Sequence, residues 1–267
     1  MSTRLDTIEY LDKNIGFFPI FNNTITNAFS WGENVGNMSF NYGDRKEVKL
    51  RIIKFLQKIS INNIQSIVNI EPEHSDNIVS ITRNKYNSLR STPVGKSINC
   101  DTLFTNTKNI ALSIKPADCT VSIIKAIDIN NKIIIGLIHA GRKGLDLSLP
   151  YKSIEYLIQH YEVNISNIQI GIIPSIGFDN YFIQNIEELK NPIIWENYSK
   201  KKNNYIYLDL KSLLLKQYQD IGIKNTQIQY YDLDTFNYAK EKISFSHRYS
   251  QMHKETANGR MIVVVKI

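Results

Sequence analysis

The stretch 115–145 constrains the fold of this chain more than any other, because it holds two apolar, β-branched runs on either side of a short polar turn. The runs cover residues 120–127 and 132–138, and the turn covers residues 128–131. Runs of this length and composition around a polar turn are typical of two β-strands joined in a hairpin. The sequence therefore predicts an antiparallel hairpin here.

A cysteine and a histidine stand at the open end of the predicted hairpin. Cys119 precedes the first run and His139 follows the second. A turn centred on Ile129 would place them directly opposite each other on one face, with Cβ atoms roughly 4.5–5.5 Å apart, whereas a slip of one residue would put them on opposite faces. At that separation a thiolate and an imidazole can share a metal ion or act as a nucleophile–base pair. A buried cysteine beside a strand-end histidine is also common in an ordinary core.

The segment after His139 is small and cationic. Residues 140–144 read Ala-Gly-Arg-Lys-Gly, and Ser148 with Pro150 signals the start of a helix. Two glycines and two cations at a strand-to-helix turn suit an anion or a phosphate-bearing ligand. Such a turn is also an ordinary connector between a strand and a helix, so an anion-binding role and a purely structural role are both open.

Charge and composition narrow the class of protein. The net charge of +7 raises nucleic acid as a partner, but the cations are spread out apart from one dense run at residues 200–202. We expect no nucleic-acid partner and instead expect the charge to favour an anionic small-molecule substrate.

No stretch approaches the ~18 uninterrupted apolar residues of a membrane span. The first residues lack the apolar core of a signal peptide, and two cysteines form no disulfide framework, so we expect a cytoplasmic location.

The rest of the chain mixes predicted strands and helices without regular βαβ alternation. Asp44, with Glu47 three positions later, starts a helix as a capping box does, and Asp209 starts another that Gly222 ends. Strands are predicted at residues 27–31, 66–70, 78–81, 110–114, 168–173, 226–231 and 261–267. Residues 32–43 read as a long glycine-containing loop. We therefore predict one α+β domain over residues 1–267, with an irregular, peripheral segment over residues 1–25.

Several of these segments also match the pattern of one known family, in the family's order. They are His74 in a polar bend between two strands, residues 101–105, Ala-Asp-Cys at 117–119, His-Ala-Gly at 139–141 with Gly144, Pro-Ser-Ile-Gly at 174–177, Ser-His-Arg at 246–248 and Gly-Arg at 259–260. From about residue 27 onward the chain resembles the YfiH-like family, which includes the laccase domain-containing protein. Its members are known both as polyphenol oxidases (laccases) and as purine nucleoside phosphorylases. The resemblance implies mixed or antiparallel sheets covered by helices, layered α/β/β/α.

The same resemblance implies a metal site made of His74, Cys119 and His139. Three protein ligands with one open position are the arrangement of a catalytic zinc site, so Zn²⁺ is the expected cofactor. Two histidines and a cysteine are also the trigonal set of a blue-copper centre, which leaves copper as the alternative. A true multicopper laccase, by resemblance to that class, needs a cluster held by many more histidines than the five in this chain.

For function, the resemblance implies phosphorolysis of adenosine, inosine, guanosine or methylthioadenosine, together with deamination of adenosine. The expected partners are thus a purine nucleoside and phosphate. Cys119, Asp118 and His139 are the candidate catalytic residues, with Asp118 also able to orient the ligands. Candidate substrate- and phosphate-binding residues are Asn41, Arg142, Lys143, Arg248 and Arg260.

The chain departs from the family pattern next to the predicted metal site. The family has His-Ala-Gly-Trp-Arg-Gly, where this chain has His-Ala-Gly-Arg-Lys-Gly at residues 139–144. Because arginine binds anions as a planar fork and lysine as a point charge, the change affects the substrate pocket. Three alternatives stand beside the phosphorylase: a metal-free hydrolase that uses Cys119 and His139, a single-copper polyphenol oxidase, and a divergent protein with a structural metal and little activity.

Overall fold

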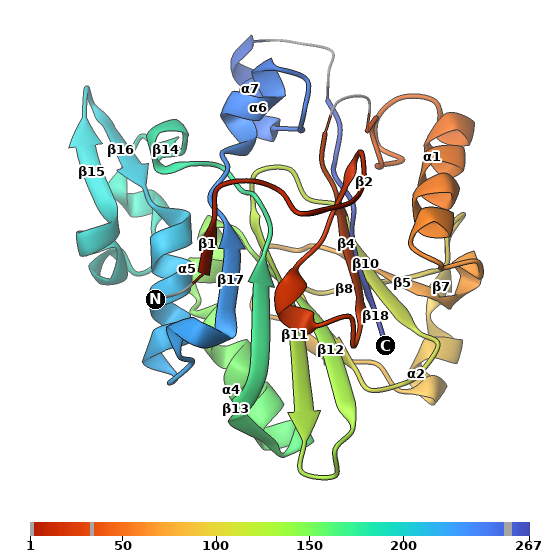
Figure 1. Cartoon of the computed structure of the whole chain (residues 1–267). Helices are drawn as coiled ribbons and strands as arrows, with labels where there is room; N and C mark the ends of the chain where they lie inside the picture. The colour runs from red at the N-terminus through yellow and green to blue at the C-terminus, as the bar shows by residue number, and fades with distance from the viewer. Residues whose placement is uncertain (1–2, 33–34, 254–257) are drawn as a thin grey trace.

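Two large β-sheets pack face to face, and helices cover their outer faces, in the computed structural model of this chain (Figure 1). The structure describes residues 3–32, 35–253 and 258–267. Figure 1 shows α1 on one side of the molecule and α4 and α5 on the other, with the sheets between them. The predicted α+β class and the α/β/β/α layering are confirmed.

The first sheet carries the predicted hairpin at its centre. Within the described residues it has seven strands, in the spatial order β1 (Thr3–Leu5), β17 (Ile228–Tyr231), β13 (Val163–Ile172), β11 (Thr120–Asp128), β12 (Ile133–Ala140), β9 (Thr102–Thr105) and β6 (Ile78–Ser80). The pairing is antiparallel in the centre, while β1–β17, β13–β17 and β6–β9 run parallel.

The second sheet packs against the inner face of the first. Its eight strands in the described part of the chain are, in spatial order, β2 (Tyr10–Asp12), β3 (Ile15–Gly16), β4 (Thr26–Ser30), β18 (Val263–Lys266), β10 (Ala111–Ile114), β5 (Ile67–Glu71), β8 (Lys96–Asn99) and β7 (Arg90–Ser91). A smaller sheet lies to one side and pairs β14 (Phe182–Ile183), β16 (Tyr205–Leu208) and β15 (Ser199–Lys202).

Strand alternation explains why β11 is apolar along almost its whole length. Successive side chains of a strand point to opposite faces of its sheet. Val121 and Ile123 therefore face the second sheet, whereas Ile124 and Ala126 face the helical layer, and all four are fully buried. A strand covered on both faces needs apolar residues at nearly every position.

Helices close both outer faces of this double layer. Asp44 caps α1 by accepting hydrogen bonds from the backbone N–H groups of Lys46 and Glu47, which confirms the predicted helix start, while the carboxylate of Glu47 accepts from Arg51. Asp209 caps α5 by accepting from the N–H of Ser212. The α-helices of the described chain are α1 (Arg45–Lys58), α2 (Arg83–Ser88), α3 (Arg142–Asp146), α4 (Leu149–Tyr161), α5 (Leu210–Asp220), α6 (Thr235–Lys240) and α7 (His247–His253). No helix in these described ranges is both long and apolar enough to cross a membrane.

The prediction of an irregular N-terminal segment was wrong, because the segment adds short strands to both sheets, although β1 and β2 are the edge strands. Strand β1 adds to the first sheet beside β17, and β3 adds to the second beside β4. Phe18 and Phe21 are almost fully buried in the core between the sheets. The strands are only two or three residues long, which is too short for a periodic pattern to show. Residues 33–34 of the predicted glycine-containing loop lie outside the described residues.

The hairpin of β11 and β12 is confirmed, but its register differs from the prediction by two residues. Val121 lies opposite His139, and Thr120 lies opposite Ala140. The N–H of Asp128 donates to the carbonyl of Lys132, and Asn131 adopts a left-handed φ of 60°. The turn is therefore a three-residue loop centred on residue 130 rather than on Ile129. Because a shift of two residues keeps each side chain on its face, Cys119 remains on the side of His139.

Candidate metal centre and cavity

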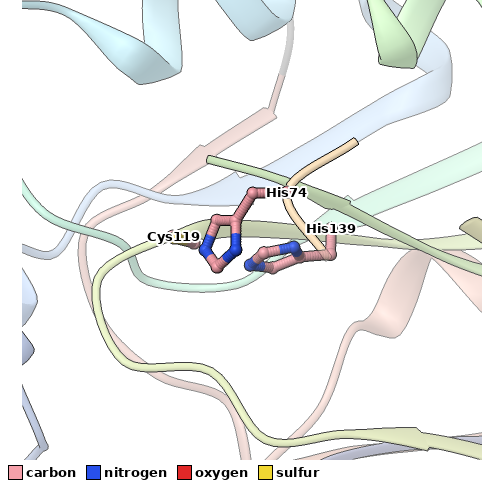
Figure 2. Close-up of side chains that lie close together, drawn as sticks. All are labelled: His74, Cys119 and His139. Atoms are coloured by element: carbon pink, nitrogen blue, oxygen red, sulfur yellow. The ribbon is translucent and has the colours of Figure 1, made fainter. Parts of the chain in front are cut away.

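Three side chains from separate parts of the chain meet at one end of the first sheet. His74 comes from the loop between β5 and β6, Cys119 directly precedes β11, and His139 lies near the end of β12. Their ligand atoms all lie within 4.8 Å of one another. The ring centroids of His74 and His139 are 5.2 Å apart and the two rings are nearly perpendicular. Figure 2 shows both rings close to Cys119.

The donor set of this group fits a transition metal. Two imidazole nitrogens and one thiolate suit zinc, with room for a fourth ligand, and they also suit copper. His139 is almost fully buried, whereas His74 is exposed, so the site opens to solvent on the His74 side. Among the described residues, this is the one group of three or more histidine, cysteine and acidic side chains with such spacing.

A buried carboxylate, Asp101, joins two of these ligands; it begins the family-like segment 101–105, but the sequence analysis gave it no role. Its Oδ1 lies 3.0 Å from Nδ1 of His139 and accepts a hydrogen bond of 3.1 Å from the N–H of His74. Its Oδ2 accepts from the N–H and from the hydroxyl of Ser75, at 2.7 and 2.8 Å. Burial alone would raise the pKa of Asp101, but the bonds from His139 and Ser75 outweigh it and lower the pKa.

Cys119 and His139 form a coupled pair in the metal-free protein. Burial alone would raise the pKa of the Cys119 thiol, but the positive charge of His139 and hydrogen bonds from His139 and His74 lower it to about 6. Burial alone would lower the pKa of His139, but the Cys119 thiolate and Asp101 raise it. The geometry therefore favours a thiolate, which is the form of cysteine that binds metals and attacks electrophiles.

A cavity of about 330 Å³ opens beside the three ligands. His74 and Cys119 form part of its wall, and three of the predicted cations, Arg142, Lys143 and Arg248, line it as well. Asp118 is the one acidic residue in this lining. The cavity therefore has a positive balance of charge, which suits an anionic ligand.

Neighbouring groups hold two of these cations in place. Arg142 donates to the carboxylate of Asp146 at 3.3 Å and to the carbonyl of Glu188. The guanidinium of Arg248 lies 5.0 Å from the ring centroid of Tyr181 and donates to the carbonyl of Phe182. These anchors fix both guanidinium groups at the cavity wall before any ligand arrives.

Asp118 uses both carboxylate oxygens inside the protein. Oδ1 accepts a hydrogen bond of 2.7 Å from the hydroxyl of Thr235, and Oδ2 accepts one of 2.7 Å from the N–H of Arg248. Burial raises the pKa of Asp118, although the bonds from Arg248, Ser246 and Thr235 oppose this. Asp118 thus links the turn before Cys119 to α6 and α7, and its predicted catalytic role stays a prediction.

Two predicted binding residues lie outside the cavity lining. Arg260 stacks on the ring of Tyr42 at 4.8 Å and donates to its hydroxyl, and Asn41 is exposed in the same loop. Conversely, Tyr181 and His247 line the cavity although the sequence analysis assigned them no role. His247 lies in the family-like Ser-His-Arg segment, so the sequence held a pattern that could have pointed to it. Tyr181 lies in no such pattern.

Comparison with known proteins identifies relatives of this chain. The family model described as multi-copper polyphenol oxidoreductase laccase matches residues 28–267. Purine nucleoside phosphorylase Cj1217c of Campylobacter jejuni is 28% identical over 155 residues. This match covers 55% of the present chain and 64% of the relative, which is less than two thirds of its length.

Solved structures extend the similarity over nearly the whole chain. Hypothetical protein YfiH of Bacillus licheniformis has a TM-score of 0.82 and 21% identity, over 98% of this chain and 100% of that one. YlmD from Geobacillus stearothermophilus has a TM-score of 0.80 and 20% identity, over 98% and 99% of the two chains. At these identities the two structures show a common fold.

Proposed function

Because this chain belongs to the multi-copper polyphenol oxidoreductase laccase family, we propose that it is a zinc-dependent purine nucleoside phosphorylase that also deaminates adenosine. The predicted membership of the YfiH-like family is confirmed by the family model and by the two structures. The proposed activity takes its substrate class from the name of the Campylobacter relative. Adenosine, inosine, guanosine and methylthioadenosine are the nucleosides that we propose as substrates.

One observation carries this proposal: the wall of a single cavity holds two of the three candidate metal ligands, His74 and Cys119, together with three cations. Phosphorolysis needs a site for phosphate beside the nucleoside, and Arg142, Lys143 and Arg248 supply charges for it. The cavity volume of about 330 Å³ is at the lower end of small-molecule sites, in keeping with a nucleoside and phosphate.

The chemistry assigns distinct tasks to the residues. In phosphorolysis an oxygen of phosphate forms a bond to C1′ of the ribose while the C1′–N9 bond breaks, and the purine leaves with the bonding electrons and takes up a proton. The three cations would hold the phosphate and stabilise its charge. In deamination, water replaces the amino group at C6 of adenosine and ammonia leaves. A zinc ion held by His74, Cys119 and His139 would supply a Lewis acid that lowers the pKa of water.

Product analysis tests this function. Purified protein is incubated with adenosine and phosphate, and ribose 1-phosphate, adenine and inosine are measured. We expect all three products with the natural protein and none with Cys119→Ala. No product from the natural protein, with the variant behaving identically, would reject the proposal.

A second candidate function follows from the Cys119–His139 pair. A thiolate stabilised by a neighbouring imidazole is the nucleophile of cysteine hydrolases, and this pair needs no metal. Elemental analysis separates the two candidates, because stoichiometric zinc that is lost in Cys119→Ser argues for the metal site. The same measurement would show copper, which would favour a single-copper polyphenol oxidase.

The third alternative is a divergent family member with a structural metal and little activity. This alternative is motivated by the departure from the family pattern at residues 142 and 143. Arg142, which donates to Asp146, stands where the family has a tryptophan ring. Turnover of any of the four nucleosides at a rate above that of Cys119→Ala would remove this alternative.

A further inference from the structure

We infer that Asp101 is a positioning residue of the metal centre, which fixes the His139 ring and the His74 loop through a single carboxylate. This inference rests on the metal site proposed above and extends it to a residue that binds no metal itself. It is carried by the hydrogen bonds around Asp101, by its complete burial and by the backbone conformation of His74.

The side-chain oxygens of Asp101 are fully used, and each partner can donate. The partners are Nδ1 of His139, the N–H of His74, and the N–H and hydroxyl of Ser75. A side chain that meets two backbone N–H groups and two further donors is suited to the carboxylate form, which only accepts. Asp101 is fully buried, so water cannot replace any of these contacts.

The contact with His139 determines which ring nitrogen is available to a metal. Because a carboxylate accepts, Nδ1 of His139 carries a proton, so Nε2 is the ring nitrogen that can bind a metal once its own proton is released. Carboxylates that hold the far nitrogen of a metal-binding imidazole fix its tautomer and raise its basicity. In addition, the N–H of His139 donates to the carbonyl of Asp101 at 2.8 Å, so backbone and side chain hold the same residue.

The contact of Asp101 with the loop at residues 74–75 holds the second ligand, His74, in position. His74 has a left-handed φ of 57°, a conformation that non-glycine residues adopt at a cost in free energy. That conformation turns two successive N–H groups, those of His74 and Ser75, toward the carboxylate of Asp101. The two hydrogen bonds offset the strain of the His74 backbone. Loss of this acceptor would let the loop relax and move the exposed His74 ring away from Cys119.

A role in stability alone would have a different signature. Asp101 also lies next to β9, directly after the fully buried Cys100, so its replacement could destabilise the fold without changing the site. Asp128 provides a matched control, because it is another buried carboxylate that accepts two backbone N–H bonds. It lies at the turn of the β11–β12 hairpin, at the opposite end from Cys119 and His139. The Asp128→Asn variant loses a comparable carboxylate far from the ligands.

The experiment compares metal affinity and ligand geometry in full-length variants. Zn²⁺ affinity is measured by competition with a chromophoric chelator, and Co²⁺-substituted protein is examined by absorption spectroscopy, which reports the coordination geometry. We expect Asp101→Asn to bind Zn²⁺ about 10- to 100-fold more weakly and to show a shifted Co²⁺ spectrum. We expect Asp128→Asn to match the natural protein in both respects, whatever its thermal stability.

Each outcome has a defined meaning. Equal affinity and equal spectra in folded Asp101→Asn and in the natural protein would overturn the inference but leave the metal site standing. Absence of Zn²⁺ binding in the natural protein would overturn the metal site, and the inference with it. If Asp101→Asn does not fold, Ser75→Ala replaces it, since that variant removes one bond to the carboxylate. We then expect a several-fold loss of affinity, and unchanged affinity would overturn the inference.

Discussion

Gly141 leaves the space that the sulfur of Cys119 occupies. A Cβ atom built on Gly141 would lie 2.8 Å from Sγ of Cys119 and 3.7 Å from Cδ2 of His74. The φ of Gly141 is −72°, so the backbone alone does not demand glycine there. The requirement is instead for space beside the thiol, directly after the β12 strand that carries His139.

The first prediction concerns this space. We expect Gly141→Ala to displace the Cys119 sulfur and to weaken Zn²⁺ binding about tenfold or more, because a distance of 2.8 Å cannot be kept. Gly144→Ala is the matched control three residues later, where a Cβ meets nothing closer than 3.5 Å. Because Gly144 lies in α3, the control should bind metal normally and gain up to about 1 kcal/mol in free energy of unfolding. Equal zinc affinity in both variants would contradict the prediction.

The second prediction concerns the pH dependence of Cys119 reactivity in metal-free protein. Since its pKa is lowered to about 6, the thiolate persists well below the range of an ordinary cysteine, and alkylation by iodoacetamide should slow only as the pH falls through about 6. Burial raises the pKa of Cys100 to about 12, so that thiol should stay unmodified. In His139→Asn the midpoint should move upward, because the positive partner is lost. A midpoint near that of free cysteine in the natural protein would refute the thiolate assignment.

The third prediction tests the cations of the cavity. Lys143 is exposed at the cavity wall, and we expect Lys143→Ala to raise the KM for phosphate about tenfold, as fits the loss of one charge-assisted hydrogen bond. The KM for the nucleoside should change less. Lys201→Ala, on the exposed strand β15, is the control and should leave both constants unchanged. Identical phosphate constants in the two variants would remove Lys143 from the binding site.

The fourth prediction separates two roles of Asp118. Its carboxylate accepts from Thr235 and Arg248, so Asp118→Asn places an amide donor against a donor and should lower the free energy of unfolding by about 1–3 kcal/mol. Denaturant unfolding of the metal-free variant measures this loss. If kcat falls sharply while the free energy of unfolding is unchanged, Asp118 acts in the reaction and not through the structure.

The sequence predicted the layout of the hairpin and the face shared by Cys119 and His139, because strand alternation is a local property. It did not predict the register, which depends on the left-handed conformation of Asn131 in the turn. The position of His74 came from family resemblance and not from periodicity, since a loop residue has no pattern to follow.

Asp101 lies in the family-like segment 101–105, but its role could not be predicted from the sequence for a different reason. Its side-chain partners lie 26 to 38 residues away along the chain, and only the packing of β6, β9 and β12 brings them together. The same holds for Tyr181, which reaches the cavity from the segment before β14. Likewise, Arg260 matched a sequence pattern, yet its guanidinium stacks on Tyr42 outside the cavity lining.

Elemental analysis of freshly purified protein tests the central claim most directly, because the zinc-dependent activity and the role of Asp101 both depend on one ion bound by His74, Cys119 and His139. The account predicts about one zinc per chain in the natural protein and in Asp128→Asn, and almost none in Cys119→Ser. Zinc that persists in folded Cys119→Ser, or a natural protein that binds no metal even after incubation with Zn²⁺, would contradict it.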